Sequence, residues 1–322
     1  MAKKRIVIRI SDPSTNGLGH LSRTLALCEH LNTNQIAYFI DWEQQPSQQI
    51  IDTIPYKVLS PTKTKEFFSV INPDDVVILD SYKIEESERT KIRTCVKKII
   101  AIVDFPQGHY QCDALIQMTG FKNLSEYSTE SYTRLFFGYQ YALLKKVFFR
   151  PLPHHERKGI LVSMGGKDEQ QVTIRVMEAI LNSSFANPVH VIYTPYFETE
   201  EIKKMLLLSE NHNNVFLHSQ LSPLDLCDLM DKCRYAVLPA STILLEALKR
   251  QVICAFGYTA ENQLNNYNSL KSLQVGFPLE NFSEANIYQK IQEFVSEELP
   301  IPSHFSETLG SRITELVEFI LT

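Results

Sequence analysis

The feature that most constrains the fold is an alternation of continuous apolar runs with helical patterns, which repeats along most of the chain. The first apolar runs are Ile6–Ile10, Ile36–Ile40, Val76–Leu79 and Ile99–Val103. Such runs are typical of strands buried on both faces, as in a parallel sheet covered by helices. Between them stand helical patterns such as Leu21–Leu31, where apolar residues recur on one helix face. The first part of the chain is therefore expected to be α/β.

A break follows at the sequence RPLPHHERKG, residues 150–159, where two prolines and two histidines stand among charges. A linker is the expected structure there. A second series follows it, with these expected elements: strand Ile160–Met164, helix Glu169–Leu181, strand Val189–Thr194, strand Val215–His218, helix Leu224–Asp231, strand Ala236–Leu238, helix Ile243–Lys249 and strand Val252–Phe256. A final helix is expected over Ser306–Leu321.

Two βα series joined by a linker predict two Rossmann-like, doubly wound domains that face a cleft. The expected boundaries are 1–150 for the first domain, 158–300 for the second and 303–322 for the C-terminal helix. In open α/β sheets the ligand binds beyond the carboxyl ends of the strands. The functional residues are therefore expected on the strand-to-helix loops.

Composition excludes several classes of function. The 322 residues carry a formal net charge of -5, which gives no basic footprint for nucleic acid. The six cysteines form no C-x-x-C pair, and no window of about 20 residues is apolar throughout. The N-terminal sequence MAKKR leads into a strand pattern without an apolar signal region. We expect a soluble, cytoplasmic protein without a metal, a cofactor or a transmembrane segment.

The loop SDPSTNGLGH carries two glycines and a histidine between a strand and a helix. Gly17 and Gly19 begin like the dinucleotide fingerprint G-x-G-x-x-G, but Ser22 replaces its third glycine. Residues 11–16 also separate the strand from Gly17, where the fingerprint needs a tight turn. Nicotinamide or flavin binding is therefore disfavoured. The glycines instead allow a ligand to approach the start of the helix, where unpaired N–H groups point outward.

His20 lies where this loop becomes a helix. The positive end of a helix favours the neutral form of a nearby imidazole, which can accept a proton. General-base catalysis is the functional hypothesis for His20. The alternative is a histidine that only hydrogen-bonds its own loop.

Polar residues also follow two later strands of the first series. Asp80, Ser81 and Tyr82 come directly after one buried strand, and Asp104 follows the next. Polar side chains in this position can line a site at the edge of the sheet. Asp80 to Tyr82 could equally cap the helix that comes after them.

The second series opens with another glycine-containing loop. Gly165 and Gly166 follow a strand, and Asp168 is placed to cap the next helix. The two glycines would let a ligand approach the backbone. Tight packing of the strand against the helix explains them equally well.

Two further loops place small or polar residues after strands. Ser241 and Thr242 open a helix whose N–H groups could hold a diphosphate, and Glu246, one turn further, suits the paired hydroxyls of a ribose. Asn262 and Gln263 follow the next strand. The alternatives are an N-cap at Ser241, a surface charge at Glu246 and an ordinary polar loop beyond the next strand.

Five motifs, in this order, resemble one known family. They are G-x-G-H-x-x-R in the first loop, D-x-Y in the second, V-S-M-G-G-x-D after the linker, then A-S-x-x-x-x-E-A-L, and N-Q in the last loop. The stretches CDALIQ and FGYQYALLKKVF also resemble this family. It comprises the UDP-2,4-diacetamido-2,4,6-trideoxy-β-L-altropyranose hydrolases of pseudaminic acid biosynthesis. The resemblance covers residues 5–273.

The resemblance implies a fold of the GT-B type, shared with inverting glycosyltransferases, and metal-independent hydrolysis of the UDP-sugar at its anomeric carbon. His20 would activate the water, and Tyr82 would position that water or the sugar. The free sugar would then serve nonulosonic acid synthesis. The resemblance also implies that these residues bind the nucleotide or the sugar: Asp12, Gly17, Gly19, Arg23, Asp80, Asp104, Gly165, Gly166, Ser241, Thr242, Glu246, Asn262 and Gln263.

Two positions depart from the family pattern. Phe105, in VDFPQG, stands where the family tends to have a second acidic residue, and Pro239, in LPAST, stands where a small polar residue is common. A different nucleotide sugar is therefore an alternative substrate. Two alternative functions remain open as well: an inverting glycosyltransferase of the same fold, and a nucleotide-sugar binding protein without activity. His20 and Tyr82 together speak against a protein that only binds.

Overall fold

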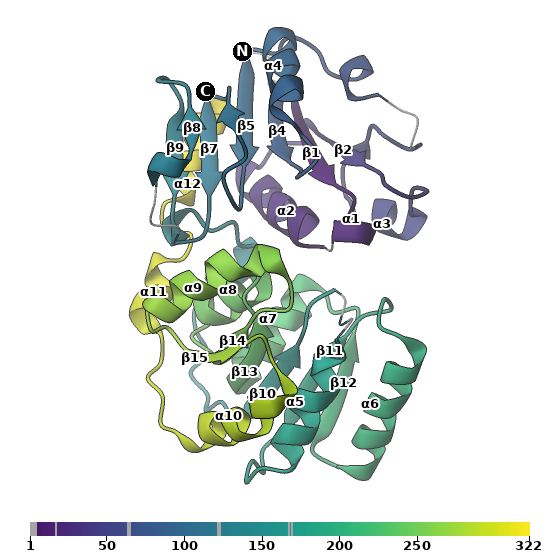
Figure 1. The fold of residues 1–322 in the computed structure, drawn as a ribbon, viewed down its shortest axis with the longest axis vertical. Coiled ribbons are helices and arrows are strands. Elements are labelled where there is room, and N and C mark those ends of the chain that lie inside the picture. The colour runs from purple at the N-terminus through teal and green to yellow at the C-terminus, as the bar shows by residue number, and fades with distance from the viewer. Residues whose placement is uncertain (1–4, 17, 63–65, 121–123, 167, 169) are drawn as a thin grey trace. The chain divides into compact units, whose positions relative to one another are not determined.

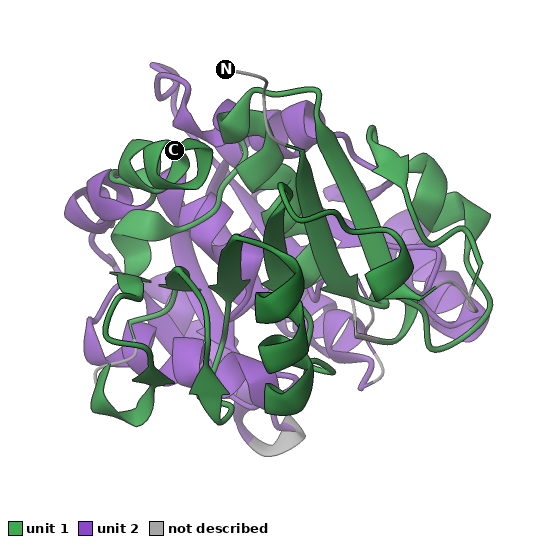
Figure 2. Cartoon of the chain, turned by 90° about the horizontal axis from the view of Figure 1, so that it is seen from above, with its two compact units in different colours: residues 1–145, 310–322 green, residues 146–309 purple. Residues whose placement is uncertain are grey.

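The computed structural model describes residues 5–16, 18–62, 66–120, 124–166, 168 and 170–322 of the chain (Figure 1). These residues fold into two compact units, which Figure 2 distinguishes by colour. The first unit comprises Met1–Lys145 together with Gly310–Thr322, and the second comprises Lys146–Leu309. Each unit has its own large sheet.

The sheet of the first unit has the strand order β3-β2-β1-β4-β5-β7-β9, and every pair in it is parallel. Its strands are β1 (Ile6–Ser11), β2 (Ile36–Asp41), β3 (Lys57–Val58), β4 (Val76–Asp80), β5 (Lys98–Ile102), β7 (Ala114–Gln117) and β9 (Arg134–Phe137). A separate short pair is formed by β6 (His109–Tyr110) and β8 (Ser128–Thr129). The strand order changes direction between β1 and β4, and ligands of open α/β sheets bind beyond the carboxyl ends of the strands at such a point.

Residues on the two faces of β1 pack in two different core layers. On one face, Ile6, Ile8 and Ile10 pack in a cluster that includes residues of α2 and α12. On the other face, Val7 belongs to a cluster that includes Ile92 of α4. The helices of this unit are α1 (Pro13–Asn16), α2 (Gly19–Leu31), α3 (Gln48–Asp52), α4 (Glu86–Cys95) and α12 (Ile313–Leu321).

The sheet of the second unit has the order β12-β11-β10-β13-β14-β15, again with parallel pairs throughout. Its strands are β10 (Gly159–Ser163), β11 (Val189–Tyr193), β12 (Val215–Ser219), β13 (Cys233–Pro239), β14 (Ile253–Gly257) and β15 (Phe277–Glu280). Here the strand order changes direction between β10 and β13. The prediction of two doubly wound α/β sheets is confirmed.

The helices of the second unit are α5 (Val172–Leu181), α6 (Thr199–Asn211), α7 (Pro223–Lys232), α8 (Thr242–Lys249), α9 (Leu264–Ser272), α10 (Glu284–Ser296) and α11 (Ser303–Thr308). Residues of α5, α6 and α10 pack in one cluster with β10 and β11. Helices α7 and α8 both contact β13. Both faces of this sheet therefore carry helices, which explains the continuous apolar runs of its strands.

The segment expected to be a linker is anchored to the second unit. The fully buried guanidinium of Arg250 donates hydrogen bonds to the carbonyls of Arg150 (2.6 Å) and Pro151 (3.0 Å). Its Nε also donates to Asp231 at 2.9 Å. Because these contacts hold the segment, the units divide after Lys145 and not at the expected residue 150.

The single C-terminal helix expected over residues 303–322 is wrong, because two helices, α11 and α12, occupy this segment. Gly310 lies between them with a φ of +67°, a conformation that favours glycine and ends helices. Beyond this turn, the N–H groups of Gly310 and Arg312 donate to the carbonyls of Tyr139 and Gln140. Helix α12 therefore belongs to the first unit.

Candidate active site in the first unit

Five of the residues singled out in the first series come together at the carboxyl ends of the central strands. They are His20 and Arg23 from the start of α2, Asp80 and Tyr82 from the end of β4, and Asp104 after β5. A hydrogen bond joins His20 to Asp80, and ion pairs join Arg23 to both Asp80 and Asp104. The cluster lies at the point where the strand order of this sheet changes direction.

His20 is buried in the first turn of α2 and pairs with the carboxylate that ends β4. Its Nδ1 lies 2.6 Å from Oδ1 of Asp80, and the two side chains are 4% and 1% exposed. An ionised carboxylate can only accept a hydrogen bond, so the neutral imidazole carries its proton on Nδ1. Nε2 then has the lone pair with which His20 can take up a proton.

Asp80 stays ionised in this buried position. Burial opposes its charge, but the neighbouring Arg23 and His20 outweigh this and lower the pKa of Asp80 to about 2. A buried carboxylate that remains charged can both orient an imidazole and stabilise its protonated form. Asp80 was expected either to bind substrate or to cap a helix. The helix α4 instead begins at Glu86 without a side-chain cap, and Asp80 contacts His20 and Arg23.

Arg23 connects the two carboxylates of the cluster. Its Nε donates to Asp80 Oδ2 at 2.7 Å, its Nη1 donates to Asp104 Oδ1 at 2.6 Å, and its Nη2 contacts Asp80 Oδ1. Burial alone would lower the pKa of Arg23, but the charges of Asp104 and Asp80 raise it well above its ordinary value. The guanidinium is a fixed positive charge at this site.

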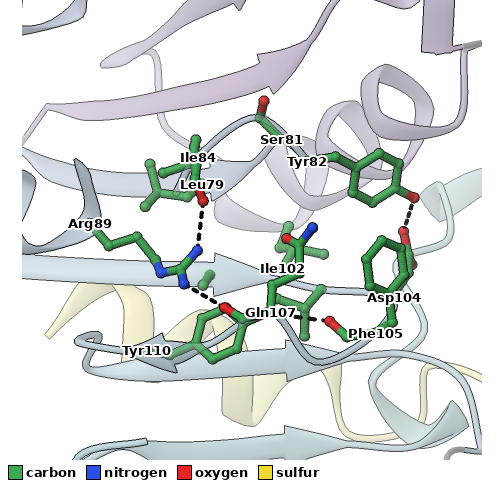
Figure 3. A pocket seen from close by; sticks show the side chains of 12 residues that line it. Leu79, Ser81, Tyr82, Ile84, Arg89, Ile102, Asp104, Phe105, Gln107 and Tyr110 are labelled. Carbon is green, nitrogen blue, oxygen red and sulfur yellow. Dashed lines mark hydrogen bonds between the residues drawn. The ribbon is translucent and has the colours of Figure 1, made fainter. Parts of the chain in front are cut away.

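Tyr82 is held between the histidine and the second carboxylate. Its ring meets that of His20 edge to face, with centroids 4.5 Å apart and an angle of 78°. Its hydroxyl donates to Asp104 Oδ2 at 2.5 Å, as Figure 3 shows. The ring of Phe105 stacks on that of Tyr82 at 5.3 Å and 27°. Phe105, the position that departs from the family pattern, thus supports the tyrosine.

A pocket of about 360 Å³, partly open to solvent, lies beside Tyr82, Asp104 and Phe105. Figure 3 shows the buried Arg89 on its wall, donating to the carbonyls of Ile84 (2.6 Å) and Gln107 (2.5 Å). These contacts hold the loop after β5 against the start of α4. Arg89 therefore shapes the pocket wall and the loop that carries Asp104.

Two other predicted residues of the first loop, Asp12 and Gly19, are not part of this cluster. Asp12 is fully buried, and its carboxylate accepts hydrogen bonds from the N–H groups of Ser14 (2.9 Å) and Glu43 (2.8 Å). It thereby ties the first loop to the one after β2. Gly19 is the first residue of α2, and among the described residues no atom outside its chain neighbours and its own helix backbone lies within 4 Å of a Cβ built there. Gly17 lies outside the described residues.

Buried polar contacts, which were not expected from the sequence, support the loop after β4. The hydroxyl of Ser81 donates to Asp41 at 2.8 Å, and the N–H of Tyr82 donates to the hydroxyl of Ser11 at 3.1 Å. Asp41 in turn pairs with Arg9 at 2.9 Å. In the sequence, these contacts are signalled by Arg9, a charged residue within an otherwise apolar strand.

In the second unit, the loop after β10 is organised by Asp168. Its carboxylate accepts the N–H groups of Val172 (2.9 Å) and Thr173 (2.6 Å), which explains why α5 begins at Val172 and later than expected. Gly165 has a φ of +86°, which a side chain would strain, and the carbonyl of Gly166 accepts the hydroxyl of Thr194 at 2.7 Å.

Helix α8 begins at Thr242, directly after β13. Ser241 occupies the N-cap position, but its side chain makes no capping hydrogen bond. The N-terminus of α8 therefore keeps N–H groups that a ligand can use. Glu246 is 6% exposed on the same helix, so it is not the surface charge of the alternative interpretation.

The loop after β14 is shaped by amide side chains. Gln263 accepts the N–H of Thr259 at 2.9 Å, whereas Asn262 belongs to the short turn Glu261–Gln263. Asn266, a buried residue that the sequence did not single out, donates to the carbonyl of Ala240 at 3.0 Å. It connects α9 to the start of α8, and its buried polar side chain is visible only in the structure.

No group of three or more histidine, cysteine, aspartate or glutamate side chains is arranged to hold a metal ion in the described part of the chain. In the same residues, none of the helices combines the length and the apolar character needed to span a membrane.

Comparisons with known proteins place the fold. No family model matches the chain. The chain is 25% identical to the uncharacterized protein MJ1062 of Methanocaldococcus jannaschii over 277 residues, which cover 80% of this chain and 57% of that protein. The chain thus spans little more than half the length of this relative.

Three solved structures share the architecture at low sequence identity. The calicheamicin glycosyltransferase CalG4 matches with a TM-score of 0.64 and 13% identity, over 100% of this chain and 99% of that one. MurG of Acinetobacter baumannii gives a TM-score of 0.62 and 10% identity, over 98% and 99%. TarM of S. aureus, in complex with UDP, gives 0.50 and 14%, over 77% and 55%. The fold is therefore of the GT-B type, with two Rossmann-like domains.

Proposed function

We propose that this chain breaks the anomeric C–O bond of a nucleotide sugar, with His20 as the base that deprotonates the attacking nucleophile. The observation that carries this proposal is the buried His20–Asp80 pair at the carboxyl ends of β1 and β4. An ionised carboxylate behind a neutral imidazole is the arrangement that general-base catalysis needs. The GT-B fold adds support, because CalG4 is named a glycosyltransferase and TarM was solved with UDP.

The proposed step balances without a metal. The nucleophile's oxygen forms a bond to the anomeric carbon, while the bond from that carbon to the diphosphate oxygen breaks and its electron pair leaves with the nucleotide. Nε2 of His20 takes the proton of the nucleophile. Asp80 then stabilises the imidazolium that has formed.

The second unit would hold the nucleotide. The N-terminus of α8, with Ser241 and Thr242, offers N–H and hydroxyl groups to a diphosphate. Glu246, on the same helix, would accept hydrogen bonds from the ribose hydroxyls. A uridine nucleotide is the proposed ligand, supported by the UDP in the TarM structure.

Two nucleophiles fit this step. The similarity to glycosyltransferases favours an acceptor hydroxyl, so inverting transfer is the activity that the comparisons support better. The five loop motifs favour water, and with it hydrolysis of UDP-2,4-diacetamido-2,4,6-trideoxy-β-L-altropyranose. Both activities use the same base and the same leaving group.

The test is UDP release from this substrate by the purified protein, in the presence of EDTA and without an acceptor. Rapid release that is lost in His20→Asn would establish hydrolysis and the base together. Binding of UDP with release only after an alcohol acceptor is added would establish transfer. Binding of UDP with no release under either condition, across several UDP-sugars, would overturn the catalytic proposal in favour of a binding protein.

A further inference from the structure

We propose that Arg23 and Asp104 are positioning residues, which hold the His20–Asp80 pair and Tyr82 in fixed positions relative to one another, and that neither is primarily a sugar contact. This inference rests on the proposed function, because it assigns these two residues to the base. It departs from what the loop motifs imply, which is that both residues bind the substrate. The contacts within the cluster carry the argument.

Arg23 lies beside the nitrogen of His20 that does not take part in the reaction. Its Nη2 is 3.1 Å from Nδ1, and the same Nη2 contacts Asp80 Oδ1. An arginine has only donors, so it cannot accept the proton on Nδ1, and its hydrogens turn to Asp80 instead. Arg23 therefore holds in place the carboxylate that orients the imidazole.

Asp104 transmits this arrangement to Tyr82. One of its oxygens accepts from Arg23 and the other from the Tyr82 hydroxyl, so both carboxylate oxygens are engaged within the protein. Phe105 stacks on the tyrosine ring, while the edge-to-face contact with His20 fixes that ring from a second direction. Arg23 and Asp104 thus link the base and the tyrosine into a closed ring of contacts.

The first test is a double-mutant cycle of Tyr82→Phe and Asp104→Asn on turnover. If Asp104 acts through Tyr82, each single change lowers kcat at least tenfold and changes KM less than threefold. The kcat of the double variant is then no lower than the kcat of the less active single variant. Additive losses, or a KM that rises tenfold in Asp104→Asn alone, would overturn the positioning role. Asp74→Asn, which removes an exposed carboxylate of the same unit, is the matched control.

The second test needs no substrate and so separates this inference from the proposed function. The contact between the rings of His20 and Tyr82 is followed by NMR, with the His20 signals assigned by their absence in His20→Asn. Asp104→Asn should weaken this contact, because the Tyr82 hydroxyl loses its charged acceptor, whereas the control Asp74→Asn should keep it.

An unchanged ring contact in Asp104→Asn would overturn the inference. Arg23→Gln leaves two buried carboxylates without their cation and can fail to fold. Arg23→Lys keeps the charge but cannot bridge both carboxylates, so it should weaken the ring contact and lower kcat. A ring contact and a kcat that both stay unchanged in Arg23→Lys would contradict the bridging role.

Discussion

The two units place polar loops at the same edge of the same kind of sheet, but one buried carboxyl group in each unit has opposite surroundings. In the first unit, Arg23 pairs with both Asp80 and Asp104, and the pKa of Asp80 is lowered to about 2. In the second unit, Glu201 is buried at the start of α6 beside Asp168, and burial together with that like charge raises the pKa of Glu201 to about 8. Asp80 therefore stays charged at neutral pH, whereas Glu201 keeps its proton.

The difference teaches how the same fold can serve two tasks. A charged, fixed carboxylate is useful where protons move, because it can stabilise the imidazolium of a base. A loop that receives a diphosphate has a different requirement, since added negative charge would repel the ligand. The N-terminus of α8, the proposed diphosphate site, fits that second requirement.

The largest effect is expected from His20→Asn. Losing the base should lower turnover by about 10²–10⁴-fold, while UDP affinity, which is assigned to the second unit, should change little. Steady-state kinetics and UDP titration measure the two quantities. The exposed His304 provides the control in His304→Asn. Turnover near that of the unchanged chain would refute the assignment of the base.

Asp80→Asn comes next. The amide cannot stabilise the imidazolium, and its NH₂ group competes with the Nδ1 proton of His20, so kcat should fall by about 10²-fold or more with the fold retained. Circular dichroism and the pH dependence of kcat check this expectation. An unchanged rate would mean that Asp80 has only a structural role.

Glu246→Ala tests the nucleotide site of the second unit. The loss of hydrogen bonds from the ribose to a charged group should weaken UDP binding by about 1–3 kcal/mol, with little change in kcat at saturating substrate. Glu200→Ala, at an exposed glutamate of the same unit, is the control for calorimetric titration. Equal UDP affinity in the two variants would remove Glu246 from the site.

The smallest effect is expected in the pH dependence of stability. The pKa of Glu201 in the folded chain lies above its ordinary value of 4.5, so its stabilising contribution is complete below that pH and is lost as the pH rises to about 8. Glu201→Gln should remove this dependence. Between pH 5 and pH 8 the Tm of the variant should therefore fall by about 2–4 °C less than the Tm of the unchanged chain. Parallel curves for the variant and the unchanged chain would contradict the raised pKa.

The same measurement at low pH sharpens the comparison. The pKa of Asp80 in the folded chain lies below its ordinary value of 3.8, so its contribution is present above that pH and is lost as the pH falls towards 2. The contributions of Asp80 and Glu201 should therefore be lost at opposite ends of the pH range.

Much of the fold could be predicted from the sequence because a doubly covered parallel sheet imposes continuous apolar strands. The runs at Ile6–Ile10 and Ile160–Met164 both became central strands, β1 and β10. The apolar periodicity of α12, extended back across Gly310, predicts one helix where the structure has both α11 and α12. That glycine was a signal for a helix end that could have been used.

The sequence indicates which candidate site residues lie on loops, but it does not indicate which of their side chains pair with one another. Asp80 lies 57 positions from Arg23, and Asp104 lies 81 positions from it, so no local spacing relates them. Their pairing depends on the strand order, which places β1, β4 and β5 side by side. The role of Phe105 likewise depends on a ring contact with Tyr82 that composition does not reveal.

Helix α12 has a consequence for the order in which the chain can fold during synthesis. Its side chains Ile313, Leu316 and Ile320 complete the core layer that contains Ile6 and Leu27. All of Lys146–Leu309 must emerge from the ribosome before this helix can dock, although the second unit has every residue it needs by then. The unit that carries His20 should therefore mature last, and a newly made chain would hold a finished second unit before its base is in place.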